Sequence, residues 1–272
     1  MTQQALESTQ SHRPIINEIQ SLANYRYLIG ELILRDIKTR YKRSLLGVAW
    51  TMVNPLLTML VMTIVFSQLF AFSLPRYPVY LLTGVLLWNF FSETTVSAIR
   101  NLIWSSALVR RIYIPKSLFA VAAVGTGLVN LLLALVPLGI IILLTGSQLG
   151  LPLLFLPVAL LLVSAFSLGV GLAVSTQAVF FTDVVDMYQI LLLAWMYLTP
   201  IFYPPEIIAD KFRWIHYVNP MYYILACFRA PLYLNEFPEP RYILGAVVFA
   251  LVALVVGGVL FARKSDEFAY YL

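Results

Sequence analysis

The sequence predicts an all-α integral membrane protein with six transmembrane helices, an N-terminal amphipathic interface helix and two short re-entrant helices between spans five and six. Of the 272 residues, 61% are hydrophobic and only 11% are charged, whereas soluble chains carry about 25% charged residues. Several charge-free runs exceed the roughly 20 residues that a helix needs to cross a bilayer. Basic residues gather beside these runs, which is typical of cytoplasmic flanks.

Residues 1–45 form the predicted cytoplasmic N-terminal region, which ends in the basic segment RDIKTRYKRS. Glu31, Arg35, Lys38 and Lys42 recur there at helical spacing. An apolar set lies on the other side, so we expect an amphipathic helix that lies flat at the membrane surface. This apolar set is Leu22, Tyr25, Ile29, Leu32 and Ile33.

The predicted transmembrane domain covers residues 46–262. The 32 positions from Ser44 to Pro75 carry no charge, and neither do the 66 positions from Ser117 to Thr182. The second run is too long for one span, and its TGSQLGLP stretch divides it in two because Gly and Pro favour a turn. The six predicted spans are about 46–72, 78–99, 117–144, 152–176, 187–203 and 242–262.

Glu93 is the one charged residue between Pro78 and Ile99. At about 1.5 Å per residue it lies some 23 Å from Pro78, near the cytoplasmic edge of a hydrocarbon core roughly 30 Å thick. A carboxylate at that depth can reach the polar surface, so we favour a snorkelling or capping role over proton coupling.

The segment between spans five and six is rich in proline and aromatic residues. Neither of its two short apolar stretches can span a bilayer. We expect two short helices, Glu206–Tyr217 and Met221–Leu234, the second capped by Asn219 and started by Pro220.

The distribution of basic residues predicts the orientation. With six spans, 13 of the 18 Lys and Arg residues fall on the side of the N-terminus and 5 on the other side. The positive-inside rule therefore predicts that both termini, including the tail 263–272, are cytoplasmic.

The sequence carries no motif for catalysis or for cofactor binding. It has no GxxxxGK[ST] phosphate loop and no HExxH, and it contains a single cysteine, Cys227, with only His12 and His216 as histidines. We therefore predict no catalytic residue, no metal site and no cofactor in this chain, and the basic residues form no stripe that would suit nucleic acid. Any driven work must draw on a partner or on an ion gradient.

Several sequence pieces together resemble the membrane subunits of ABC-2 type exporters that move lipid-linked polysaccharides, including O-antigen and wall teichoic acid permeases. Their order and spacing, rather than any single piece, carry the resemblance, which covers nearly the whole chain beyond residue 25. One departure is FFTDV, which lacks an Arg beside Asp183. The pieces are RDIKTRYKRSLLGVAWTMVNPLL, WNFFSE, LVRRIYIPK, YLTPIFYP, VNPMYY followed by Phe228 and Arg229, and the terminal FAYYL.

The resemblance implies a homodimer in the inner membrane of a bacterium, seated on two ATP-binding cassette subunits that hold ATP and Mg²⁺. It implies that the N-terminal helix and the loop after span two contact these subunits, and that the short outer helices gate the path. The expected subunit contacts are Arg35, Lys38, Arg40, Arg100, Arg110, Arg111 and Tyr113. The expected path and gate residues are Trp88, Tyr197, Phe202, Tyr203, Trp214, Tyr222, Tyr223 and Arg229.

Two other classes compete with this hypothesis. An ATPase-independent secondary transporter or channel should place ionisable residues near the membrane midplane, where the sequence offers only the peripheral Glu93. A membrane-bound transferase needs convergent acids or histidines, and Asp183 with Asp186 better fits a helix start. For the substrate, four basic residues on the outer side slightly favour phosphate-rich teichoic acid over O-antigen: Lys211, Arg213, Arg229 and Arg241.

Overall fold

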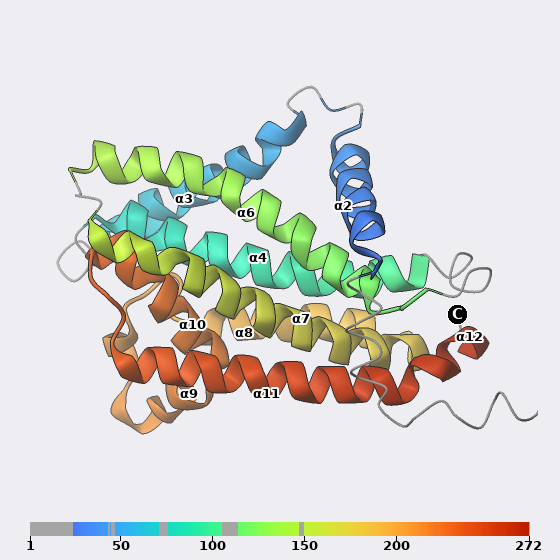
Figure 1. Cartoon of the computed structure of the whole chain (residues 1–272). Helices are drawn as coiled ribbons and strands as arrows, with labels where there is room; N and C mark the ends of the chain where they lie inside the picture. The colour runs from blue at the N-terminus through green and yellow to red at the C-terminus, as the bar shows by residue number, and fades with distance from the viewer. Residues whose placement is uncertain are drawn as a thin grey trace, which may run out of the picture.

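The computed structural model describes residues 24–42, 44, 47–70, 76–104, 114–146 and 150–271, and within them all regular structure is helical. Long helices run side by side as a bundle, and α2 stands crosswise at one end (Figure 1). Short turns precede α3 and α7, at Gly47–Ala49 and Leu151–Phe155. The main helices are α2 Arg26–Tyr41, α3 Trp50–Phe70, α4 Tyr77–Trp104, α6 Leu118–Leu144, α7 Leu156–Phe180, α8 Val184–Leu198, α10 Pro220–Arg229 and α11 Pro240–Lys264.

Four helical stretches are long and apolar enough to cross a membrane. They are Gly47–Phe66, Leu118–Leu144, Leu151–Phe180 and Pro240–Glu267, which match the predicted first, third, fourth and sixth spans. The predicted second span corresponds to α4 and the predicted fifth to the shorter α8. Six spans therefore remain a prediction, whereas the all-helical class is confirmed for the described residues.

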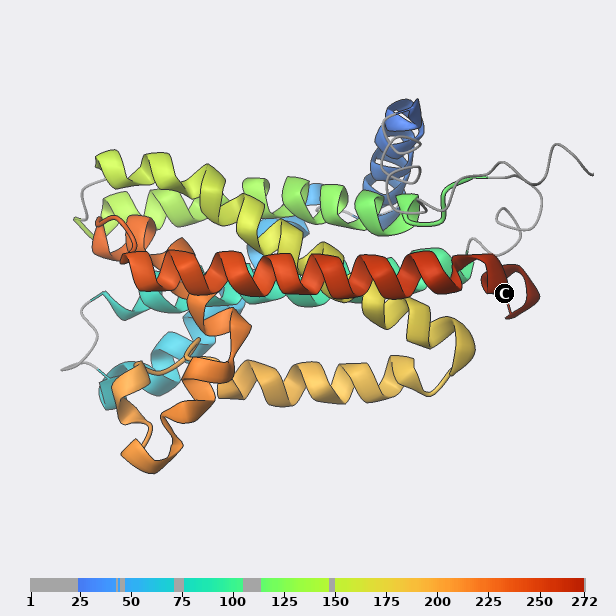
Figure 2. The ribbon, with the colours of Figure 1, turned by 60° about the horizontal axis from the view of Figure 1, so that its bottom comes forward.

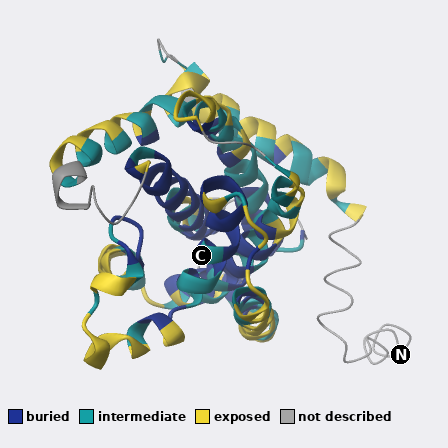
Figure 3. Ribbon diagram, turned by 90° about the vertical axis from the view of Figure 1, so that its left-hand side faces the viewer, coloured by how far each residue is buried: buried dark blue, intermediate teal, exposed yellow. Residues whose placement is uncertain are grey.

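α4 is the central helix of the bundle. It packs against α3, α6, α7, α8 and α10, and most of its side chains are buried. Viewed from the left-hand end of Figure 1, buried residues gather in the middle and exposed ones lie around them (Figure 3). Because neighbouring helices cover most of α4, it tolerates Asn89, which is partly buried, whereas the side chain of Glu93 is 50% exposed.

α8 differs from the predicted fifth span. It begins at Val184 and ends at Leu198, so its 15 residues cover only about 22 Å. Only Tyr188 and Leu192 are buried in this helix, which runs apart from α11 in Figure 2. The helix ends early because Thr199 is extended (ψ 134°) and Pro200 follows, and a residue before proline avoids the helical region.

The segment between α8 and α11, residues 199–239, contains one of the two predicted short helices. We call it the outer segment because the sequence predicts that it faces outward. The predicted helix Glu206–Tyr217 is wrong: the chain instead forms turns at Pro205–Ile207 and Asp210–Phe212, then α9, Trp214–Val218. Ile208 and Ala209 are extended between them (ψ 124° and 143°). An isolated helix of about 12 residues is marginal in water.

The second short helix is present. α10 begins at Pro220, and the side chain of Asn219 accepts a hydrogen bond from the backbone N–H of Met221, which confirms the predicted cap. A π-helical turn, Ala230–Leu234, extends it to the predicted end.

The closest helix contact joins α7 and α11. A Cβ added to Gly257 would lie 2.0 Å from the carbonyl oxygen of Gly169, so only glycine permits this approach. Small residues of this kind allow helices in lipid to pack backbone against backbone. Gly169 of α7 and Gly257 of α11 therefore serve helix packing.

A second, smaller hydrophobic core lies at the end of the bundle that carries α2. Leu32 of α2 is buried there, and Ile33 packs nearby against Gly125 of α6, so the predicted apolar face of the segment faces the bundle. The C-terminal tail is also helical, with α12 at Phe268–Tyr271, and Phe268 is fully buried. Residues 105–113 of the predicted partner-binding loop lie outside the described residues, and its first residues, 100–104, continue α4.

Candidate functional site

The outer segment is held against the outer end of α4 by tyrosine hydroxyl groups. The Tyr77 hydroxyl donates a hydrogen bond to the carbonyl of Phe202 (2.9 Å). The Tyr80 hydroxyl lies within hydrogen-bonding distance of the carbonyls of Pro200 (3.1 Å) and Tyr203 (2.8 Å). These hydroxyls provide partners for irregular backbone that is buried from water, where an unpaired carbonyl is costly.

Arg229, at the end of α10, completes the attachment of the outer segment. Its side chain is buried (8% exposed), and it donates to the carbonyl of Pro200 (3.0 Å) and the Thr83 hydroxyl (3.4 Å). The guanidinium lies 3.7 Å from the centre of the Tyr80 ring. Gly84 leaves room for it, since a Cβ there would come within 2.8 Å of the guanidinium.

The charge of Arg229 is therefore stabilised by dipoles and by an aromatic ring. No ion pair of this residue with a carboxylate occurs within the described part of the chain. Burying an unpaired charge costs several kcal/mol, and carbonyl oxygens together with a ring face offset that cost. The family resemblance assigned Arg229 to the substrate path. In the structure, its N–H groups instead donate to the Thr83 hydroxyl and to the Pro200 carbonyl of the outer segment.

Asn219 ties α8 to the start of α10. Its side-chain oxygen accepts from the indole N–H of Trp195 (2.7 Å), and its amide nitrogen donates to the Thr199 hydroxyl (3.0 Å). Sequence reasoning found the cap but not these contacts, because they join residues about 20 positions apart.

The predicted gate aromatics divide into buried and exposed groups. Trp88 is buried against Trp195 and Phe91, and Phe202 is also buried. Trp214 and Tyr197 are exposed, at 59% and 58%. Tyr203, Tyr222 and Tyr223 are partly buried.

The partly buried tyrosines are engaged by their neighbours. The Tyr203 hydroxyl donates to the carbonyl of Tyr197, and the Tyr223 hydroxyl donates to the carbonyl of Tyr217. Tyr222 stacks on His216 with ring centres 4.9 Å apart. Burial lowers the pKa of His216, and the nearby negative charge of Glu206 opposes that shift, so the imidazole in this stack is held towards its neutral form.

A recess of about 220 Å³ opens between the outer segment, α4, α10 and the start of α11. Its lining combines tyrosine rings with two carboxylates, from Glu236 and Glu239, and it reaches Arg229 at its buried side. Ring faces and carboxylates are groups that contact sugars well, because a sugar has apolar faces and hydroxyl edges. We call this space the outer recess.

At the opposite end, the predicted partner-binding cations are exposed. Arg35 pairs with Asp36 (2.9 Å) and Lys38 is open to solvent, while Arg100 lies 5.3 Å from the ring centre of Trp104. Arg40 pairs with Glu93 of α4 at 2.8 Å, which gives Glu93 a partner that sequence reasoning missed. Arg110, Arg111 and Tyr113 lie outside the described residues.

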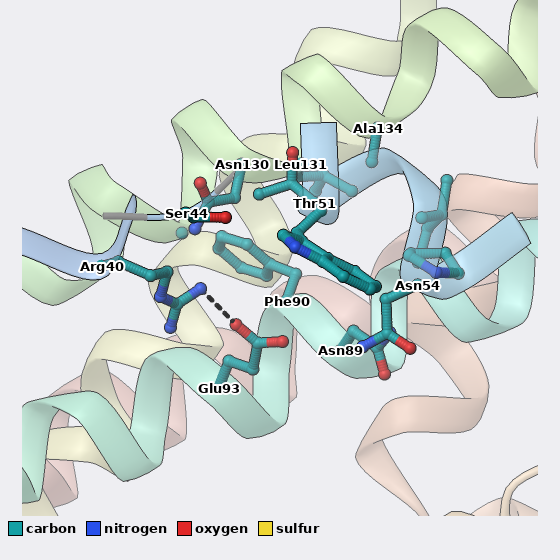
Figure 4. Close-up of a pocket in the computed structure, with 14 residues that line it drawn as sticks. Arg40, Ser44, Thr51, Asn54, Asn89, Phe90, Glu93, Asn130, Leu131 and Ala134 are labelled. Atoms are coloured by element: carbon teal, nitrogen blue, oxygen red, sulfur yellow. Dashed lines mark hydrogen bonds and ion pairs between the residues drawn. The ribbon is translucent and has the colours of Figure 1, made fainter. Parts of the chain in front are cut away.

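Between α2, α3, α4 and α6 lies a second space of about 280 Å³ (Figure 4). We call it the inner recess because the sequence predicts that this end is cytoplasmic. The Arg40–Glu93 pair borders it, and Asn54, Asn89 and Asn130 line it from three different helices. Sequence reasoning missed this site. The available signal was one asparagine in each of three mostly apolar runs, but only the packing brings them together.

The fold and these recesses define a polytopic helical membrane protein with polar sites at both ends of its central helix. The chain belongs to the ABC-2 type transporter family, whose pattern its residues 27–233 match. It is 26% identical over 257 residues to the O-antigen export system permease protein RfbA of Myxococcus xanthus, covering 94% of this chain and 99% of that protein.

Two further relatives are similar over nearly their full lengths. The RfbA protein of Klebsiella pneumoniae is 26% identical over 92% of this chain and 97% of its own. The capsule polysaccharide export inner-membrane protein CtrC of Neisseria meningitidis serogroup A is 26% identical over 91% of this chain and 94% of its own. The predicted resemblance to the ABC-2 exporters is thereby confirmed.

The attachment of the outer segment predicts a stability effect at Arg229. Replacing it in Arg229→Gln removes the charged donors of the Pro200 carbonyl and of Thr83, which should destabilise the purified protein by about 2–3 kcal/mol. Arg229→Lys should also destabilise it, because an ammonium group cannot reproduce the planar fork. The measurement is apparent Tm in one detergent.

Arg213→Gln is the matched control, since Arg213 is exposed and pairs only at the surface with Asp210; such a pair contributes about 0–1 kcal/mol. Equal Tm values for Arg229→Gln and Arg213→Gln would contradict the proposed attachment.

Proposed function

We propose that this chain is the permease subunit of an ABC exporter that carries a lipid-linked cell-surface polysaccharide across the inner membrane of a bacterium. The observation that carries the proposal is the match to polysaccharide-export permeases along almost the whole length of both chains. The family match supports a transport subunit and gives no support to the transferase alternative.

The energy for export would come from a partner. We propose two copies of this chain and two ATP-binding cassette subunits, with ATP and Mg²⁺ bound by the latter. The exposed cations of α2 and the end of α4 support a docking surface at this end of the bundle. Because α2 packs on α6 through Leu32 and Ile33, a subunit bound to α2 would act directly on the helical bundle.

The cations of the outer segment and the names of the relatives both bear on the substrate class. The expectation of teichoic acid depended on four outer cations, but Arg229 is occupied by carbonyl groups, Arg213 pairs with Asp210 and Arg241 pairs with Glu239. Two of these charges are therefore paired with carboxylates and the third is held by carbonyl dipoles inside the fold, which weakens the preference for a phosphate-rich polymer. The names of the relatives support O-antigen or capsule polysaccharide as the first substrates to test.

The direct test of this function is loss of export. Cells without this chain should lose the polysaccharide from their surface and accumulate the lipid-linked polymer inside, measured by surface labelling and by lipid extraction. A partner ATPase inactivated at its Walker-A lysine should give the same phenotype, because that lysine contacts the nucleotide phosphates. Continued export with the inactive ATPase would support the secondary transporter instead.

We further propose that the outer segment gates the path and that Trp214 touches the polymer. Its ring is exposed, so Trp214→Ala should leave the fold intact and lower the export rate by about two- to tenfold, the range that loss of one aromatic contact of 0.5–1.5 kcal/mol gives. Tyr270→Ala is the control, because that ring is even more exposed (89%) but lies in the C-terminal tail. Equal export by both variants would reduce Trp214 to a membrane-interface anchor.

The proposed six crossings would place Asp183 and the C-terminal tail in the cytoplasm and Glu236 outside. Single cysteines at these exposed positions, in a Cys227→Ala background, test this arrangement with an impermeant thiol reagent. We expect Glu236→Cys to label in intact cells, and Asp183→Cys and Asp266→Cys only after permeabilisation. Labelling of Asp183→Cys from outside would show that α8 does not cross the membrane.

A further inference from the structure

The inner recess combines polar groups that are unusual within apolar helices. Figure 4 shows Asn54, Asn89 and Asn130 arranged around one space, with the Arg40–Glu93 pair at its edge. Its volume of about 280 Å³ is near the lower end of small-molecule sites, about 300 Å³. A polar group inside a membrane helix is costly and often marks a functional site.

Two features show that the polar groups of this recess are not fully used by the fold. The side-chain oxygen of Asn130 is buried without a hydrogen-bond partner in the described structure. Pro55 lies inside α3, and since proline has no N–H it cannot donate to the carbonyl of Thr51, which also lines the recess. An occupant with hydroxyl donors would give the Asn130 oxygen a partner.

The charged pair at the edge can change partners. The side chains of Arg40 and Glu93 are 39% and 50% exposed, and an exposed pair of this kind contributes only about 0–1 kcal/mol. A phosphate offers the guanidinium two oxygen acceptors in a geometry that fits its fork. Glu93 therefore holds Arg40 in a position that an anionic head group would take over.

We propose that the inner recess binds the phosphate and the first sugar of the lipid-linked substrate before export, which rests on the proposed function. Arg40 contacts the phosphate, and the three asparagines contact sugar hydroxyls. Trp50, which also lines the recess and is 46% exposed, offers a ring face to the sugar. Glu93 competes with the phosphate for Arg40.

This competition gives the two charged residues opposite effects. The probe is a polyprenyl diphosphate monosaccharide, and the measurement is its dissociation constant for the full complex with the ATPase subunits in nanodiscs. Arg40→Gln should weaken binding about tenfold or more, because it removes a charge-assisted contact. Glu93→Gln should strengthen binding by up to about fivefold, because it removes the competitor. If the pair were only a clamp between α2 and α4, both variants would shift binding in the same direction, which would overturn the proposal.

Matched control variants distinguish the loss of a contact in the recess from a general effect on probe binding. Lys42→Gln removes a cation near the same end of α2 outside the recess and should leave binding unchanged. Asn130→Ala should weaken binding several-fold, while Thr126→Ala removes another unpartnered buried oxygen of α6 that does not line the recess and should have no effect. Equal loss in Asn130→Ala and Thr126→Ala would contradict a direct contact.

A competition experiment distinguishes the lipid-linked sugar from an ordinary phospholipid as the source of the bound phosphate. Excess phosphatidylglycerol should not displace the probe, because it lacks the sugar ring that the asparagines and Trp50 contact; equal displacement would overturn the sugar assignment. If the wild-type complex binds the probe and the recess variants bind it equally well, the inner recess is not the binding site. The proposed function would still stand in that case. Loss of surface polysaccharide in the deletion strain tests that function separately.

Discussion

The fold of the outer half depends on the contact between the Arg229 guanidinium and the turn that follows α8. A bilayer supplies no water for irregular backbone, so a non-helical turn at membrane depth needs partners within the protein. Arg229 and the hydroxyls of Tyr77 and Tyr80 supply them. These contacts hold the irregular chain between the end of α8 at Leu198 and the start of α10 at Pro220.

α4 brings the two ends of the molecule into one structural unit. Its outer half carries Tyr77, Tyr80 and Thr83, which hold the outer segment, and its inner half carries Asn89 and Glu93, which line the inner recess. A lipid-facing helix could not carry this many polar groups. The burial of α4 by its neighbours is therefore what permits polar sites at both ends of one helix.

The sequence predicted the parts of the fold that depend on local pattern. Length and hydropathy located α3, α6, α7 and α11, and Asn219–Pro220 located the start of α10. The turn that follows α8 after Leu198 was missed, because it is held by distant contacts such as Tyr80 with Tyr203. Convergence of Asn54, Asn89 and Asn130 was missed for the same reason: helical periodicity gives the face of each helix but not which faces meet.

The inner end of the structure suggests how a partner would reach the inner recess. α2 is attached to the bundle by its apolar residues in the small core, by a hydrogen bond from Asn101 of α4 to Asp36, and by the Arg40–Glu93 pair at its C-terminal end. The core contact is buried and resists separation, whereas the ion pair is exposed and contributes little to stability. A small rotation of α2 about the buried contact would therefore break the ion pair before it disturbs the core. In the proposed transporter, such a rotation by a bound ATPase subunit would change the distance between Arg40 and the recess, and thereby couple nucleotide state to the grip on the lipid phosphate.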